Sequence, residues 1–277
     1  MHPNFSFPQI LWTASFAAQL VLLVVLMGRD RIRRFPFFTA SMTLFTLRLL
    51  IEELLSGRLP MITLQSVLIP VADLGTVLGL LVVVEIGRRG FAGASRQAWL
   101  TTAAGLTAVS AIALYLLGRP WPAAAELAVD SPLALLRLLQ FVGQKANLFV
   151  SVLTVTVFLL VVFFGRSFKA GWRSHSTLVL AGLTAIAAAW LGIIGYWQHL
   201  TSGLHAGITR AEYQQILALG SKLFNANKIL YVVVVLWWIA VLWFDEPGST
   251  PSLTEGLPAE APLAVDESAS EEVEQQN

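Results

Sequence analysis

Residues 64–86 read LQSVLIPVADLGTVLGLLVVVEI, an apolar run long enough to cross a bilayer as a helix. If this helix enters the membrane near residues 61–63, Asp73 lies about ten residues in. At about 1.5 Å per residue this depth is about 15 Å, near the middle of the hydrocarbon layer. An ionisable side chain there is costly and marks a candidate functional site. Pro70 removes one helix hydrogen bond and predicts a kink beside the carboxylate.

The composition of the whole chain is that of a membrane protein. Hydrophobic residues make up 56% and charged residues 13% of the 277 positions, whereas soluble domains carry about 25% charged residues. No cysteine is present, which excludes disulfides, thiolate metal ligands and a cysteine nucleophile. The lipid bilayer is the expected partner, and nucleic acid is not.

Seven apolar segments of about twenty residues predict an all-α, polytopic integral membrane protein with seven transmembrane helices. Basic residues are unevenly shared among the short connections: 28–36, 87–97 and 165–174 hold three or four each, whereas 56–60 holds one. The positive-inside rule then places the N-terminus outside and the C-terminus in the cytoplasm of a multi-pass plasma or inner membrane protein. The expected spans are residues 9–27, 37–56, 63–86, 98–117, 146–165, 176–199 and 223–244.

The chain is expected to form one transmembrane domain, residues 1–246, and one tail. Long outer connections, 119–145 and 200–222, predict a small outer cap into which the fifth and seventh helices project. A capping box, Thr209-Arg-Ala-Glu212, marks the start of the seventh helix. Residues 247–277 hold seven acidic residues, four prolines and no aromatic residue, which predicts a disordered tail. The tail could bind a cytoplasmic partner or serve only to keep the protein soluble.

Polar residues concentrate in the outward-facing half of the predicted spans, and the inner half has little beyond Glu85. This residue is one turn from Arg88 and Arg89 and can pair with them at the surface. Arg48 and Glu52 lie four residues apart and can pair, and Asp73 needs a cation such as Arg48 or Lys228. One interpretation is a pocket open to the outside, and the other is an ion-pair network that only fixes helix register. The residues expected to line the pocket are Arg48, Glu52, Asp73, His199, Asn225 and Lys228. The polar outer half also contains Glu53, Lys145, Asn147, Tyr196, Gln198 and Asn227.

Standard catalytic and cofactor motifs do not occur: the sequence has no HExxH, no GxSxG, no Walker loop and no GxGxxG. We therefore expect neither an enzyme nor a bound cofactor. His2, His199 and His205 are all predicted outside, but their spacing fits no standard metal site, so no metal site is expected.

The leading functional interpretation is a non-catalytic, receptor-like protein that senses or binds a small polar or ionic ligand from the outer side. A first alternative is a small-solute transporter. Segments 19–29 and 156–166 match at six of eleven positions, and a layout of three helices, a linker helix and three helices resembles the 3+1+3 sugar-transporter fold. Shared Gly-Arg helix ends explain the match without a repeat. A second alternative is a structural or assembly subunit, whose polar residues would pair among themselves with no cavity.

Overall fold

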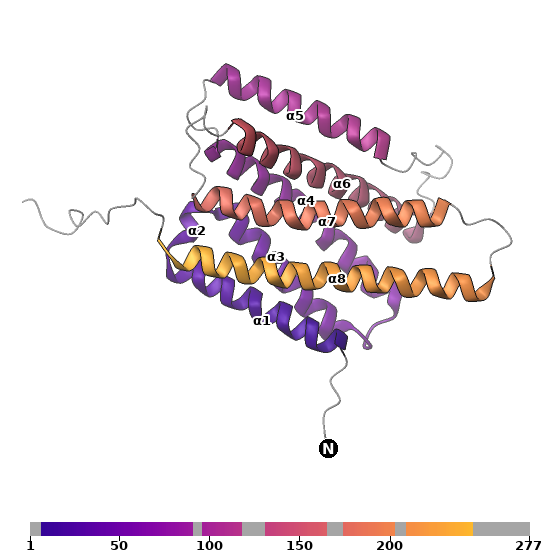
Figure 1. Cartoon of the computed structure of the whole chain (residues 1–277). Coiled ribbons are helices and arrows are strands. Elements are labelled where there is room, and N and C mark those ends of the chain that lie inside the picture. Colours follow the sequence, from indigo (N-terminus) through magenta and orange to yellow (C-terminus); the bar gives the residue numbers. More distant parts are fainter. Residues whose placement is uncertain (1–6, 91–95, 118–130, 165–173, 203–208, 246–277) are drawn as a thin grey trace, which may run out of the picture. The chain divides into compact units, whose positions relative to one another are not determined.

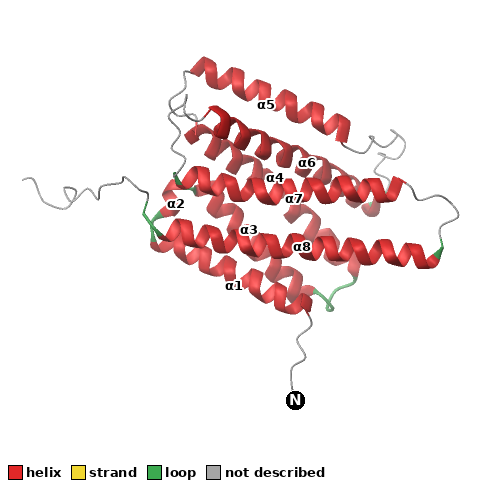
Figure 2. Cartoon of the chain, viewed as in Figure 1, coloured by secondary structure: helices red, strands yellow, loops and turns green. Residues whose placement is uncertain are grey.

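The computed structural model of the chain describes residues 7–90, 96–117, 131–164, 174–202 and 209–245. This part of the chain is all helical and contains eight helices (Figure 1, Figure 2). They are α1 (Phe7–Gly28), α2 (Arg31–Arg34), α3 (Pro36–Leu55), α4 (Met61–Gly90), α5 (Arg96–Leu117), α6 (Pro132–Phe164), α7 (His175–Ser202) and α8 (Arg210–Trp243).

Each predicted span falls on one long helix, and α2 is an additional short helix in the first basic connection. Within the described residues, five helices are long and apolar enough to cross a membrane, namely α1, α4, α6, α7 and α8. α5 supplies a shorter apolar segment, Leu100–Leu116, and the 20-residue α3 carries Arg48, Glu52 and Glu53. The all-α class and five possible spans are therefore established, whereas seven spans and the orientation of the termini stay predictions.

The two longest helices are α6, with 33 residues, and α8, with 34 residues. At about 1.5 Å per residue each is about 50 Å long, whereas the hydrocarbon layer is about 30 Å thick. Both are therefore long enough to project beyond a membrane. All described helices belong to one compact unit, residues 1–246. The cap and the tail stay predictions, because residues 118–130, 203–208 and 246–277 lie outside the described residues.

The start of α8 is fixed by the capping box that the sequence predicts. The Thr209 hydroxyl accepts a hydrogen bond from the Glu212 N–H at 3.3 Å, and the Glu212 carboxylate accepts one from the Thr209 N–H at 2.9 Å. These bonds satisfy backbone donors that a helix start would otherwise leave unpaired. α8 therefore begins well before its apolar segment.

Six of the long helices form a ring. α1 contacts α3, α3 contacts α4, α4 contacts α6, α6 contacts α7, α7 contacts α8, and α8 returns to α1. α4 also contacts α7 across the ring. α5 lies outside it, against α6 (Figure 1). The ring therefore consists of two groups of three consecutive long helices, and α5 connects the groups from the periphery.

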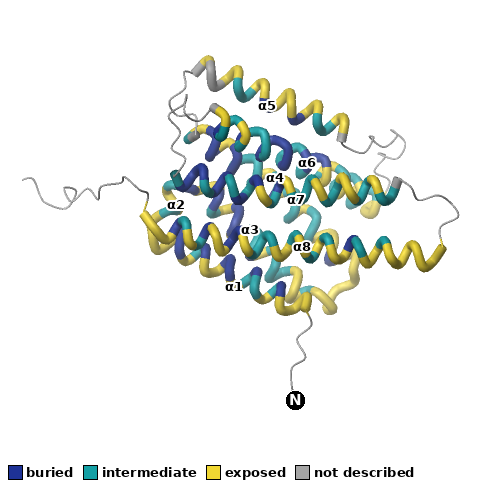
Figure 3. The backbone as a smooth tube through the Cα atoms, viewed as in Figure 1, coloured by how far each residue is buried: buried dark blue, intermediate teal, exposed yellow. Residues whose placement is uncertain are grey.

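The tightly packed core lies at the end of the ring that contains α2, where the dark blue segments gather in Figure 3. Trp238 is fully buried in this core, its Nε1 donates a hydrogen bond to the Val179 carbonyl at 3.3 Å, and its ring meets Phe38 edge-on with centroids 5.1 Å apart. The six ring helices contribute, in chain order, Leu26, Phe38, Ile86, Val161, Val179 and Trp238. Exposed residues become frequent toward the opposite end of α8 (Figure 3).

Charged side chains at the α2 end pair with neighbouring groups. One oxygen of the buried Glu85 carboxylate accepts a hydrogen bond from the Phe38 N–H at 3.3 Å, in the first turn of α3, and the other lies 3.4 Å from Arg89. The sequence-based prediction that Glu85 pairs with a following arginine is thus confirmed, although the carboxylate is buried rather than on the surface. Arg31 bonds to Asp245 at 3.0 Å and ties the end of α8 to α2.

We predict that Gly182→Ala destabilises the protein. A Cβ at residue 182 of α7 would overlap Nε1 of Trp238, and overpacking a core costs roughly 1–3 kcal/mol of unfolding free energy. The measurement is the Tm of the purified protein in detergent. Gly192→Ala, on the same helix, is the control: no atom lies within 4 Å of its new Cβ, and alanine is favoured over glycine in helices by roughly 0.5–1 kcal/mol. Equal Tm values for the two variants would contradict the packing at Trp238.

Candidate functional site

A cavity of about 810 Å³ lies inside the ring, between α3, α4, α6, α7 and α8. Its floor is formed by residues that also belong to the core, among them Phe38, Val82 and Trp238. Other lining residues, including Arg48 near the end of α3 and Gln198 near the end of α7, lie toward the opposite end of the ring. The cavity therefore extends from the apolar core toward the end of the bundle that is remote from α2.

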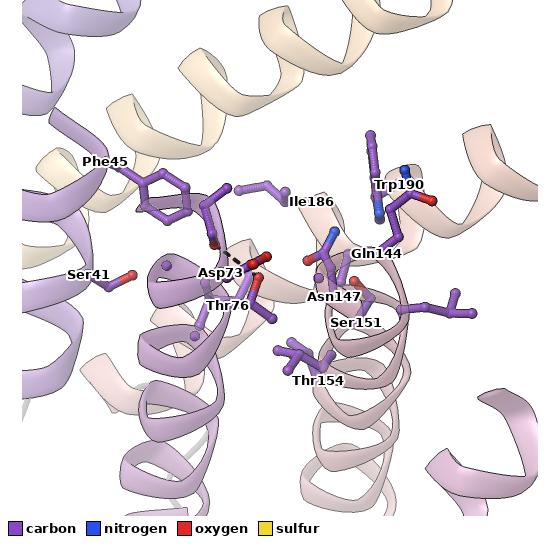
Figure 4. Close-up of a pocket in the computed structure, with 18 of the residues that line it drawn as sticks. Ser41, Phe45, Asp73, Thr76, Gln144, Asn147, Ser151, Thr154, Ile186 and Trp190 are labelled. Atoms are coloured by element: carbon purple, nitrogen blue, oxygen red, sulfur yellow. Dashed lines mark hydrogen bonds between the residues drawn. The ribbon is translucent and has the colours of Figure 1, made fainter. Parts of the chain in front are cut away.

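Asp73 of α4 lies in the wall of this cavity (Figure 4). Among the described residues, no Lys, Arg or His nitrogen lies within 4.0 Å of its carboxylate, and no hydrogen bond reaches it. The expected ion pair with Arg48 or Lys228 is therefore not formed, and the expected pair of Arg48 with Glu52 is not formed either. The ion-pair network that would only fix helix register is absent around Asp73 in this part of the chain.

The Asp73 carboxylate packs against Gly143 of α6. A Cβ at residue 143 would overlap Oδ1 of Asp73, so the missing side chain is what allows α6 to approach the carboxylate. On both sides of this contact α6 presents polar side chains to the cavity (Figure 4). They are Gln140, Gln144, Asn147, Ser151 and Thr154. Their alternating spacing of four and three residues keeps them on one helical face.

Aromatic side chains from four helices form much of the remaining wall. Trp190 of α7 and Phe224 of α8 lie with ring centroids 6.1 Å apart, and the Lys145 ammonium lies 5.4 Å from the centroid of Phe141. The aromatic residues above the floor are Phe45, Phe141, Trp190, Trp197, Phe224 and Tyr231. The lining thus combines one carboxylate, two cationic side chains, amides and hydroxyls with large apolar faces, which is the usual composition of small-molecule sites.

Two buried polar atoms of the lining have no hydrogen-bond partner within the described residues. One is a donor, Nε1 of Trp190, and the other is an acceptor, Oδ1 of Asn227. Buried polar groups in proteins are nearly always hydrogen-bonded, to water or a ligand if not to protein. These two atoms, and the Asp73 carboxylate in the same wall, can therefore bond to water or to a polar ligand in the cavity.

Polar groups just behind the cavity wall are, by contrast, satisfied within the protein. Gln19 of α1 is fully buried; its Nε2 donates to the Tyr231 hydroxyl at 2.7 Å, and its Oε1 accepts from the Thr46 hydroxyl at 3.0 Å. This network joins α1, α3 and α8 and holds Tyr231 in place in the wall. The missing partners are therefore a property of the cavity and do not extend to every polar residue of the ring.

Of the six residues that the sequence assigns to the pocket, Arg48 and Asp73 line the cavity. The other four lie on lining helices but are not among the lining residues: Glu52, His199, Asn225 and Lys228. Asn227 and Gln198 line it in place of their neighbours Asn225 and His199. Pro70 lies within α4, which continues as a helix through it. A role of any of these residues in binding stays a prediction.

The polar face of α6 was not predicted from the sequence. Only Asn147 was placed in the polar outer half, without being assigned to the pocket. The signal was available, since residues 140, 144, 147, 151 and 154 follow helical spacing in a segment that is apolar apart from them and Lys145. Gln19 gave no comparable signal, because a single glutamine in an apolar helix has no periodic pattern. No group of three potential metal ligands occurs among the described residues.

In comparisons with known proteins, no family model, curated protein or solved structure matches this chain. Its class therefore follows from its own geometry. It is a multi-helical protein with several helices long and apolar enough to embed in a membrane, and it encloses a cavity with an unpaired carboxylate.

We predict that Gly143→Ala lowers the Tm, because the new Cβ would force the Asp73 carboxylate and α6 apart at a cost of roughly 1–3 kcal/mol. In an Asp73→Ala background the same substitution should be neutral or stabilising, because the overlapping oxygen is gone. Thermal unfolding of the parent, the two single variants and the double variant measures this coupling. Purely additive effects would show that the two residues are not in contact.

Proposed function

We propose that this chain is a non-catalytic, receptor-like membrane protein whose cavity binds a small polar or ionic ligand. The observation that carries the proposal is the unpaired Asp73 carboxylate in the wall of an 810 Å³ cavity. A charge within the depth of a membrane is costly unless it is solvated or paired. A polar occupant that reaches Asp73 supplies this compensation, and the unpaired atoms of Trp190 and Asn227 offer further hydrogen bonds.

The proposal includes seven spans with the N-terminus outside and the cavity open to the outer face of a plasma or inner membrane. α3 has its place among the spans because it lies within the ring, between α1 and α4. Its Arg48 lines the cavity, so this charge does not face lipid. With the basic connections on the cytoplasmic side, the apolar core faces the cytoplasm and the cavity faces outward.

A transporter for a small solute is the second candidate, and the position of α5 favours it. α5 lies outside the ring, and the groups α1, α3, α4 and α6, α7, α8 enclose the cavity between them. This agrees with a 3+1+3 layout with its binding site between two halves. Transport would also require the core at the α2 end to open. Ligand uptake into proteoliposomes supports the transporter, whereas binding without uptake supports the receptor.

A structural or assembly subunit is the least favoured reading of the three. That alternative expects the polar residues to pair among themselves and to leave no cavity. Instead, Asp73 and Arg48 have no ion-pair partner among the described residues, and both line an open volume.

The cysteine-free sequence allows a direct test of the cavity, because a single introduced cysteine is then the only thiol. We predict that Asn147→Cys, in the lining of α6, reacts in intact cells with a membrane-impermeant, water-borne methanethiosulfonate. Val157→Cys, on the same helix, should stay unlabelled because its side chain is buried in the core. Val21→Cys, on the exposed side of α1, should stay unlabelled because that side faces lipid in the proposed arrangement. The measurement is a mass shift of the purified protein.

Failure of Asn147→Cys to react, in both intact cells and inverted vesicles, would overturn the water-accessible cavity. Reaction in inverted vesicles alone would leave the cavity in place and reverse the proposed orientation. Labelling of Val157→Cys at the same rate would show that the core is open as well, which the receptor proposal does not allow.

A further inference from the structure

Two side chains of opposite charge, Arg48 and Asp73, line the same cavity without an ion pair between them. Neither has another ion-pair partner among the described residues. Lys145 also lines the cavity, but its ammonium lies over the Phe141 ring and it has a further interaction of its own. The cavity therefore offers a ligand one unpaired anionic group and one unpaired cationic group.

The two charges lie at nearly the same depth in the bundle. α3 and α4 run antiparallel, and the Phe45 ring lies 3.8 Å from the Cβ position of Gly75, which sets their register. Arg48 follows Phe45 by three residues and Asp73 precedes Gly75 by two. At about 1.5 Å per residue, they lie about 4.5 Å and about 3 Å from this contact, both toward the end remote from α2.

The surrounding groups also suit a ligand that carries both charges. Nε1 of Trp190 is an unpaired buried donor that suits an anionic group, and Oδ1 of Asn227 is an unpaired buried acceptor that suits an ammonium. Gln144 and Asn147 of α6, which both lie to the right of Asp73 in Figure 4, can donate and accept hydrogen bonds. The aromatic faces, such as Phe45 beside Asp73, suit an alkylammonium group through cation–π contacts.

We infer that the cavity binds a small zwitterion of the amino-acid or betaine type, with its cationic group toward Asp73 and its anionic group toward Arg48. This inference rests on the proposed binding function and specifies the class of ligand. A ligand of one charge would pair with only one of the two side chains and would leave the other without a partner in the cavity. The volume of about 810 Å³ leaves room for an apolar side chain or for water beside the charged groups.

The test uses the full-length protein in lipid nanodiscs and two matched sets of probes. In the first set glycine betaine is compared with choline, which lacks the carboxylate, and with tert-butylacetate, which lacks the cation. In the second set L-leucine is compared with isoamylamine and 4-methylvalerate. Calorimetric titration should show at least one zwitterion binding roughly ten-fold or more tightly than both of its singly charged analogues, because each analogue leaves one of the two charged groups of the cavity unpaired.

Two variants test the contributions of Arg48 and Asp73 separately. Arg48→Gln should remove the preference for the zwitterion over its cationic analogue, and Asp73→Asn should remove the preference over the anionic analogue. Lys222→Gln and Glu53→Gln remove exposed charges of the same signs outside the lining and should leave both preferences unchanged. If either cavity variant fails to fold, protection of Ser151→Cys is measured instead. This residue lies between the charges and the core, so a bound zwitterion should block its labelling and the analogues should not.

The zwitterion inference is overturned if neither zwitterion binds or protects more strongly than its analogues. If Asn147→Cys is labelled and a singly charged probe binds tightest, the binding cavity stands and only the ligand class is wrong. If Asn147→Cys is not labelled from either side, the proposed function itself fails together with this inference.

Discussion

The contact between the Asp73 carboxylate and Gly143 constrains the helices that surround it. A carboxylate on an apolar helix needs either a cation or a polar volume beside it, and the described residues bring no cation within reach. Gly143 lets α6 come close enough for its polar face to share that volume. The glycine at residue 143 thus brings the amides of α6 and the Asp73 carboxylate to the same cavity.

The two ends of the ring differ in how tightly they are packed. At the α2 end, Trp238, Phe38 and their neighbours fill the space, and even Glu85 is paired with a backbone N–H and with Arg89. Toward the other end the same helices leave a cavity. The buried network of Gln19, Thr46 and Tyr231 lies behind the wall and keeps α1, α3 and α8 in register. The well-packed core at the α2 end therefore supports a cavity in which some polar groups lack partners among the described residues.

Sequence reasoning located the long helices well, because apolar length alone marks them. It also brought Arg48 and Asp73 to the same site by depth. The errors concern residues at similar depth that point to different sides of a helix. Asn225 and Asn227 are two residues, or about 200°, apart around α8, and only Asn227 lines the cavity. In an apolar helix no amphipathic pattern shows which face meets lipid and which meets protein. The same lack of pattern hid the peripheral position of α5, the buried partners of Gln19 and the hydrogen bond from the Phe38 N–H to Glu85.

The peripheral helix α5 also decides the direction in which the second half of the ring is traversed. The chain passes along the bundle three times through α1, α3 and α4, and α5 carries it back once more before α6 begins (Figure 1). α1 and α6 consequently run in the same direction. Without α5 the second group of three helices would be turned upside down relative to the first, so a helix that contributes nothing to the cavity wall determines the parity of the whole fold.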